Sequence, residues 1–133
     1  MRLLNFSNLE ISQILVSIYF SIVFFQSSID KIIDRENNIL FFNEHFKNTI
    51  IKKFVPMLLT SLAVLEFFVA SLNALAIIYS LLYSNLTFIF YGLLACGVVL
   101  LMLLFGQRLA KDYVGAADIT IYFILCIITI MSF

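Results

Sequence analysis

The chain has 133 residues, of which 63% are hydrophobic and 12% are charged, and its mean hydropathy is +1.10. This composition is far too apolar for a soluble globular domain. Basic and acidic residues balance at a formal net charge of zero. We expect no nucleic-acid partner. The composition predicts an integral membrane protein that has the lipid bilayer as a partner.

Four long apolar segments follow one another along the chain, at residues 9–29, 55–80, 86–105 and 114–133. Each has close to the ~20 residues that a helix needs to cross a bilayer core about 30 Å thick, whereas spanning strands would be shorter and alternate apolar with polar residues. The first segment lacks a preceding basic region and is too long for a typical signal peptide, so we count it as a membrane helix. The sequence predicts a single all-α domain over residues 1–133, an integral membrane up-and-down four-helix bundle.

The stretch between the first two segments carries its own pattern. Within residues 35–54, large apolar side chains recur at four-residue spacing: Phe42, Phe46, Ile50 and Phe54. This spacing predicts a short interfacial helix between helices one and two, which either caps the bundle or acts as a mobile lid over a pocket. Pro56 fits the first turn of the second membrane helix, where its missing N–H matters least.

Basic residues are unevenly divided between the two ends of the predicted bundle. Arg2 falls on the side of both termini, and the other Lys and Arg residues fall on the side of the long loop: Lys31, Arg35, Lys47, Lys52, Lys53, Arg108 and Lys111. The positive-inside rule therefore predicts that the long loop is cytoplasmic and that both termini are outside.

Polar side chains converge at the same end of the bundle. They come from the end of helix one and from the turn into helix four: Gln26, Asp30, Lys31, Gln107, Arg108, Asp112 and Asp118. Glu66 lies deeper, roughly 15 Å beyond Pro56 at ~1.5 Å per residue, and Asn73 shares its face of the helix. One end of the bundle is thus predicted to be polar.

Glu66 is the most informative of these residues. An ionisable side chain inside an apolar helix is costly in lipid, so it must face protein, water or a ligand. Glu66 is either a protonated or Arg-paired acid that holds helices in register, or a functional group. Arg108, with its long side chain, is the cation that we expect to reach toward it.

Few residues of the chain could bind a metal or attach a cofactor, because it has two cysteines, Cys96 and Cys126, and one histidine, His45. The cysteines form no Cys-x-x-Cys pair and are interpreted as small packing residues, and a lone loop histidine cannot supply both axial ligands of a haem. No Cys and His cluster has the spacing of a zinc site. We therefore expect no metal-bound or covalent cofactor, so that a redox cofactor would be a diffusible quinone or belong to a partner.

Three short segments together resemble a known family. These are residues 25–31 (FQSSIDK), Pro56 with Glu66, and residues 105–113 (FGQRLAKDY), and they resemble the DoxX-like family of small four-helix membrane proteins. In that family a Ser-Gly pair commonly precedes the helix-one lysine, whereas Ser27-Ser28 stands here. Members are linked to quinone-dependent oxidation of sulfur compounds and to thiol and oxidative-stress complexes, frequently as small subunits beside a catalytic protein.

The resemblance implies a pocket that takes a quinone head group or another small polar molecule. Its expected residues are Gln26, Lys31, Glu66, Gln107 and Arg108, with Asp30, Asn73, Asp112 and Asp118 as secondary candidates. Arg108 or Lys31 would stabilise negative charge on a quinone oxygen, and Glu66 would exchange its proton.

Three functions follow in order of preference. The first is an accessory subunit of a quinone-linked oxidoreductase in the bacterial cytoplasmic (inner) membrane, beside protein partner subunits. The second is a non-catalytic structural or assembly subunit of a larger membrane complex. The third is a transporter of a small solute or lipid that works as an oligomer, because four helices of one protomer rarely enclose a path.

Overall fold

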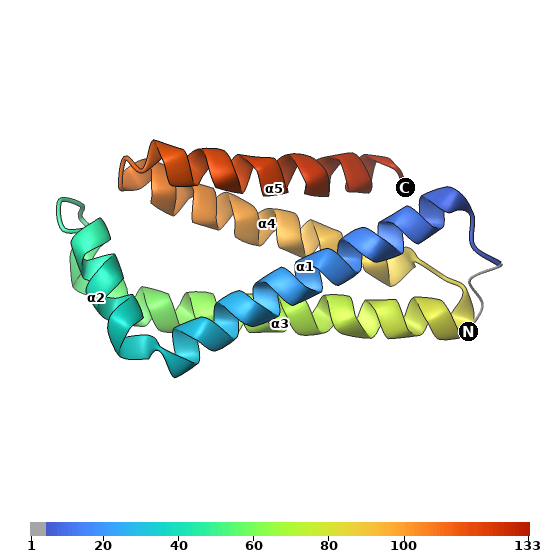
Figure 1. Ribbon diagram of the computed structural model, residues 1–133, viewed down its shortest axis with the longest axis horizontal. Coiled ribbons are helices and arrows are strands. Elements are labelled where there is room, and N and C mark those ends of the chain that lie inside the picture. Colours follow the sequence, from blue (N-terminus) through green and yellow to red (C-terminus); the bar gives the residue numbers. More distant parts are fainter. Residues whose placement is uncertain (1–4) are drawn as a thin grey trace.

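The structure is a computed structural model that describes residues 5–133, and within them it is all-helical, without a strand (Figure 1). In this described part of the chain the helices follow in the order α1 (Asn8–Ile33), α2 (Arg35–His45), the short 3-10 helix η2 (Lys52–Phe54), α3 (Val55–Tyr83), α4 (Thr87–Leu109) and α5 (Tyr113–Met131).

Four of these helices, α1, α3, α4 and α5, are long and apolar enough to cross a membrane. They coincide with the four predicted apolar segments, as expected of a multi-pass membrane protein. Both α1 and α4 continue about one turn past the apolar segments, because polar residues such as Lys31 and Gln107 extend a helix as readily as many apolar ones.

The helix ends follow from local sequence. Ser7 and Glu10 form a capping box at the start of α1, in which each side chain bonds the backbone N–H of the other, at 3.1 and 3.0 Å. Pro56 occupies the first turn of α3, as predicted. Ser84 ends α3 in the left-handed region at φ 55°, and the Asp112 side chain caps the start of α5 by accepting from the Gly115 N–H at 2.9 Å.

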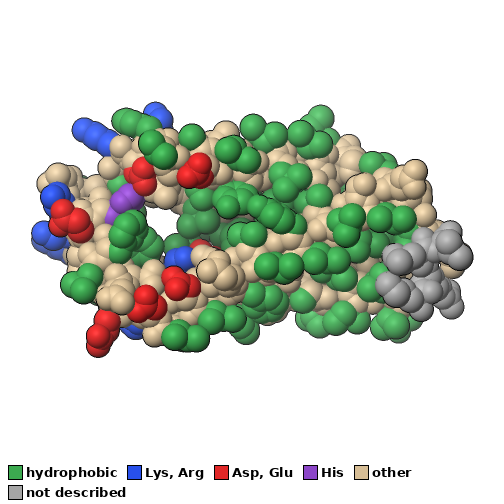
Figure 2. Space-filling model, in the orientation of Figure 1, with side chains coloured by type: hydrophobic (Ala, Val, Ile, Leu, Met, Phe, Trp, Pro, Cys, Tyr) green, Lys and Arg blue, Asp and Glu red, His purple; other side chains and the backbone are tan. Residues whose placement is uncertain are grey.

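The long helices pack mainly as neighbours, α1 against α3 and α5 against α4, with α3 and α4 in contact between them. Figure 1 shows α1 crossing α3 and shows α2 turned across one end, while the start of α1 and the end of α5 lie at the opposite end. The core between the helices is aromatic and aliphatic, and includes Phe20, Phe24, Ile89 and Leu93. Their outward faces carry many exposed hydrophobic side chains, and Figure 2 shows charged side chains gathered at the α2 end.

The segment between α1 and α3 is less regular than its spacing indicates. α2 follows α1 after a single residue, Asp34, and ends at His45, so the repeat that starts at Phe42 does not continue in one helix. The polar run after Phe46 ends the helix, because the Thr49 N–H and hydroxyl both bond the Phe46 carbonyl, at 3.0 and 2.8 Å. No residue of α2 is buried.

Candidate functional site

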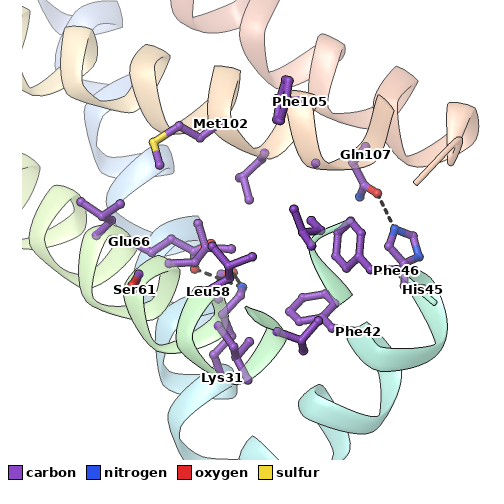
Figure 3. A pocket seen from close by; sticks show the side chains of 18 of the residues that line it. Lys31, Phe42, His45, Phe46, Leu58, Ser61, Glu66, Met102, Phe105 and Gln107 are labelled. Carbon is purple, nitrogen blue, oxygen red and sulfur yellow. Dashed lines mark hydrogen bonds and ion pairs between the residues drawn. The ribbon is translucent and has the colours of Figure 1, made fainter. Parts of the chain in front are cut away.

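A cavity of about 740 Å³ lies at the α2 end of the molecule. It is bounded by α3 and α4, by the last turns of α1, and by α2 with the turn that follows it (Figure 3). Most of its wall is apolar, from residues that include Phe42, Phe46, Leu58, Leu62, Val98, Leu101 and Met102. Figure 2 shows the surface hollowed beside α2. The size and the largely apolar wall are typical of small-molecule sites.

An ion pair lies on one wall of this cavity. Lys31, from the last turns of α1, places its Nζ 3.2 Å from both carboxylate oxygens of Glu66, which belongs to α3. The same Nζ donates to the Ser27 hydroxyl at 2.7 Å. The side chain of Glu66 is 1% exposed and that of Lys31 is 10% exposed, so both charges are largely buried where they line the cavity.

A second polar group lies across the cavity, where Figure 3 shows His45 and Gln107 joined. The His45 Nε2 and the Gln107 Oε1 are 2.9 Å apart, which links the end of α2 to α4. Asp112 approaches the same imidazole nitrogen at 3.7 Å while it caps α5. The cavity thus has apolar walls between two polar groups, one on α1 and α3 and one on α2 and α4.

The structure brings three of the five predicted pocket residues to this cavity: Lys31, Glu66 and Gln107. Gln26 is exposed and does not line it, because five residues along a helix separate Gln26 from Lys31 by about 140° of rotation.

Arg108 does not line the cavity either, and the predicted Arg108–Glu66 pair is wrong. The guanidinium of Arg108 lies over the ring of Tyr113, 4.6 Å from its centre, and Glu66 pairs with Lys31 instead. Gln107 and Arg108 are adjacent on α4, so their side chains point about 100° apart and only Gln107 faces the cavity.

The secondary candidates are dispersed. Asp30 and Asp118 are exposed, and Asp112 lies at the outer edge of the His45 contact. Asn73 belongs to a separate buried cluster in which its amide nitrogen bonds the carbonyls of Val69 and Gly92, and its oxygen accepts from Ser17 at 2.9 Å. That cluster is internally satisfied and holds α1, α3 and α4 together.

The cavity residues that the predicted pocket lacked include His45, Phe42 and Phe46. The four-residue spacing of Phe42 and Phe46 indicated a shared face, and that face turns toward the cavity. His45 was considered only as a metal ligand, and its contact with Gln107 joins residues 62 positions apart, which no local pattern indicates. Ser27 was noted beside Lys31 but was not assigned to the pocket.

The described residues place neither a cluster of metal ligands nor a cysteine in the wall of the cavity. Within residues 5–133 no three His, Cys, Asp or Glu side chains come together as a metal site would need. Cys96 and Cys126 are both buried and free, and the Cys126 thiol contacts the Leu93 carbonyl at 3.2 Å.

Comparisons of the chain with protein-family models, with curated proteins and with solved structures find no match. The resemblance to the DoxX-like family therefore stays a prediction, and the site is interpreted from its own geometry.

Proposed function

We propose that this protein is a DoxX-like membrane protein that binds a quinone, or a similar small ring molecule, in the cavity at its α2 end. The observation that carries the proposal is the Lys31–Glu66 pair, a buried pair of charges on the wall of an otherwise apolar cavity. Charged side chains inside a membrane domain are expensive, and a polar group in an apolar pocket is the usual means of orienting a ligand.

The chemistry of the wall suits a ring with carbonyl groups. The Ser27 hydroxyl supplies a donor on one side, and the Gln107 amide supplies N–H donors on the other. Phe42 and Phe46 supply flat apolar surface between them. A quinone ring carries hydrogen-bond acceptors on opposite edges and an apolar body, which matches this distribution.

We further propose that the protein is an up-and-down four-helix bundle in the bacterial inner membrane. In this arrangement α2 lies in the membrane interface and the long loop is cytoplasmic. In that arrangement a hydrophobic ligand reaches the cavity from the bilayer. The protein then serves as an accessory subunit, and a redox partner supplies the electrons. The gathering of charged side chains at the α2 end supports an interface position there (Figure 2).

Binding of decylubiquinone to the purified protein in lipid nanodiscs tests this function. Gly106 lines the cavity, and a Cβ at this position would lie 3.7 Å from the Phe46 ring, so G106L fills the space without a clash at Cβ. A117L adds a leucine on an exposed face of α5 and serves as the matched control. We expect saturable binding in the wild type and in A117L, and its loss in G106L. Binding that is absent, or equal in all three proteins, would refute the proposal.

One observation favours a second candidate, a structural or assembly subunit. The Lys31–Glu66 pair joins α1 to α3, so it also serves as a contact between helices. If K31M/E66L, which replaces both charges by apolar side chains, retains the same protein partners in native membranes and the wild type retains no quinone, the structural function is the better description.

A further inference from the structure

The hydrogen-bonding capacity of Lys31 is already used within the protein. An ammonium has three N–H donors, and the Nζ of Lys31 has three acceptors, which are the Ser27 Oγ at 2.7 Å and the two Glu66 oxygens at 3.2 Å. The charge of Lys31 is likewise balanced by the carboxylate beside it. A ligand in the cavity therefore meets a neutral pair of charges and not a free cation.

Ser27 keeps hydrogen-bonding capacity that Lys31 lacks. Both charged side chains are largely buried, with 1% of Glu66 and 10% of Lys31 exposed. Ser27 accepts from Lys31, and among residues 5–133 no hydrogen bond donated by its hydroxyl is found. The hydroxyl proton of Ser27, which lines the cavity, is thus left to be donated to a ligand.

We infer that Glu66 is a specificity-determining residue that makes the cavity select an uncharged amphiphile with a carbonyl or other acceptor, and exclude an anionic one. This inference rests on the proposed function of the cavity and adds the charge class of its ligand. Removal of the Glu66 charge should therefore convert the cavity into a site for anions.

The cost of desolvation excludes a charged ligand from the cavity. An anion that enters the cavity loses its hydration, and Lys31 does not compensate it because the Glu66 carboxylate already holds that ammonium and repels a second negative charge. A cation is also disfavoured, because Lys31 already neutralises the Glu66 carboxylate and repels a second positive charge. An uncharged acceptor loses little hydration and gains the Ser27 hydrogen bond.

Three probes with the same chain length separate these cases in the wild type. They are methyl laurate, which is uncharged and has an ester acceptor, laurate, which is anionic, and dodecylamine, which is cationic at neutral pH. Binding is measured in nanodiscs, and the signal from G106L, in which the cavity is filled, is subtracted as partition into lipid. We expect methyl laurate to bind about tenfold or more tightly than either charged probe, in line with one hydrogen bond gained and no desolvated charge.

E66Q then tests the role of Glu66 itself. Glutamine keeps the shape of the side chain but leaves the Lys31 ammonium without a counter-charge, so laurate should bind E66Q about tenfold or more tightly than it binds the wild type. E44Q changes an exposed carboxylate on α2 in the same way and should leave laurate binding unchanged. Circular dichroism establishes that each variant keeps its helical content.

Different experimental outcomes would refute the inference and the proposed function. If laurate binds the wild type as tightly as methyl laurate, or binds E66Q no better than the wild type, the inference is wrong although the cavity still binds ligands. If no probe binds in a manner that G106L abolishes, both the inference and the proposed function fail. If E66Q does not fold, the comparison of the three probes on the wild type still decides the inference, because an uncompensated Lys31 would make laurate the tightest probe.

Discussion

The burial of the Lys31–Glu66 pair predicts an unusual stability pattern among three variants. K31M leaves Glu66 without a cation eleven residues into α3, about 17 Å along the helix at 1.5 Å per residue. Removing one partner of a buried ion pair costs about 3–5 kcal/mol, because the remaining charge is uncompensated. E66L should cost less than K31M, because Lys31 lies two residues before the end of α1 and lines the cavity, where water can solvate its ammonium.

The double variant K31M/E66L provides the decisive comparison. Both replacements are apolar and similar in volume to the originals, and such replacements of a buried ion pair are often neutral or stabilising. We therefore expect the double variant to be more stable than either single variant. Unfolding in mixed micelles of dodecylmaltoside and SDS, followed by far-ultraviolet circular dichroism, measures the four free energies.

The Lys47–Glu44 pair supplies the control for this experiment. Its N–O distance of 2.7 Å is shorter than the 3.2 Å of the buried pair, but its side chains are 52% and 74% exposed. The hydrogen bond and charge of Lys47 lower the pKa of Glu44, yet water screens the pair, so K47M should leave stability unchanged. The reasoning is refuted if K31M costs no more than K47M, or if the double variant loses the sum of the two single losses.

Further variants test three other contacts. H45A removes the hydrogen bond between α2 and α4, so hydrogen exchange of the α2 amides should become faster while that of α3 stays the same; equal rates in both proteins would contradict the link. In G92A the new Cβ would lie 2.8 Å from the Asn73 Oδ1, so we expect a loss of about 1–3 kcal/mol. G97A, whose Cβ would meet only a sulfur at 3.8 Å, should cost nothing, and equal losses in the two unfolding curves would contradict close packing at Gly92. D112A removes the side-chain cap of α5 and should cost about 1 kcal/mol in the same assay, whereas an unchanged midpoint would show that the cap is dispensable.

The membrane helices could be predicted because apolar length alone defines them, and the confirmed position of Pro56 shows that local rules also define helix starts. Glu66 could be singled out for a related reason, since a charge in an apolar segment needs a partner wherever it lies. The identity of that partner could not be predicted. It depends on how α1 crosses α3 and on which of two adjacent residues of α4, Gln107 or Arg108, faces inward.

The second polar group of the cavity could not be predicted from the sequence for a different reason. His45 and Gln107 meet because α2 turns across the end of the molecule, and the turn depends on the single residue between α1 and α2. Apolar spacing predicted a helix in this part of the chain but not its end at His45. Side-chain bonds to the backbone, such as those of Thr49, decide such ends and are weak signals in sequence.

The central claim is that the cavity between Lys31–Glu66 and His45–Gln107 holds a hydrophobic ring ligand. Photolabelling of the protein in native membranes with a photoreactive ubiquinone analogue, followed by mass spectrometry of the labelled peptides, tests it most directly. The account predicts label on cavity residues of α3 and α4 such as Leu62 and Leu101, competition by unlabelled decylubiquinone, and loss of the label in G106L. Label that is confined to lipid-facing residues, or that excess decylubiquinone does not reduce, would contradict it.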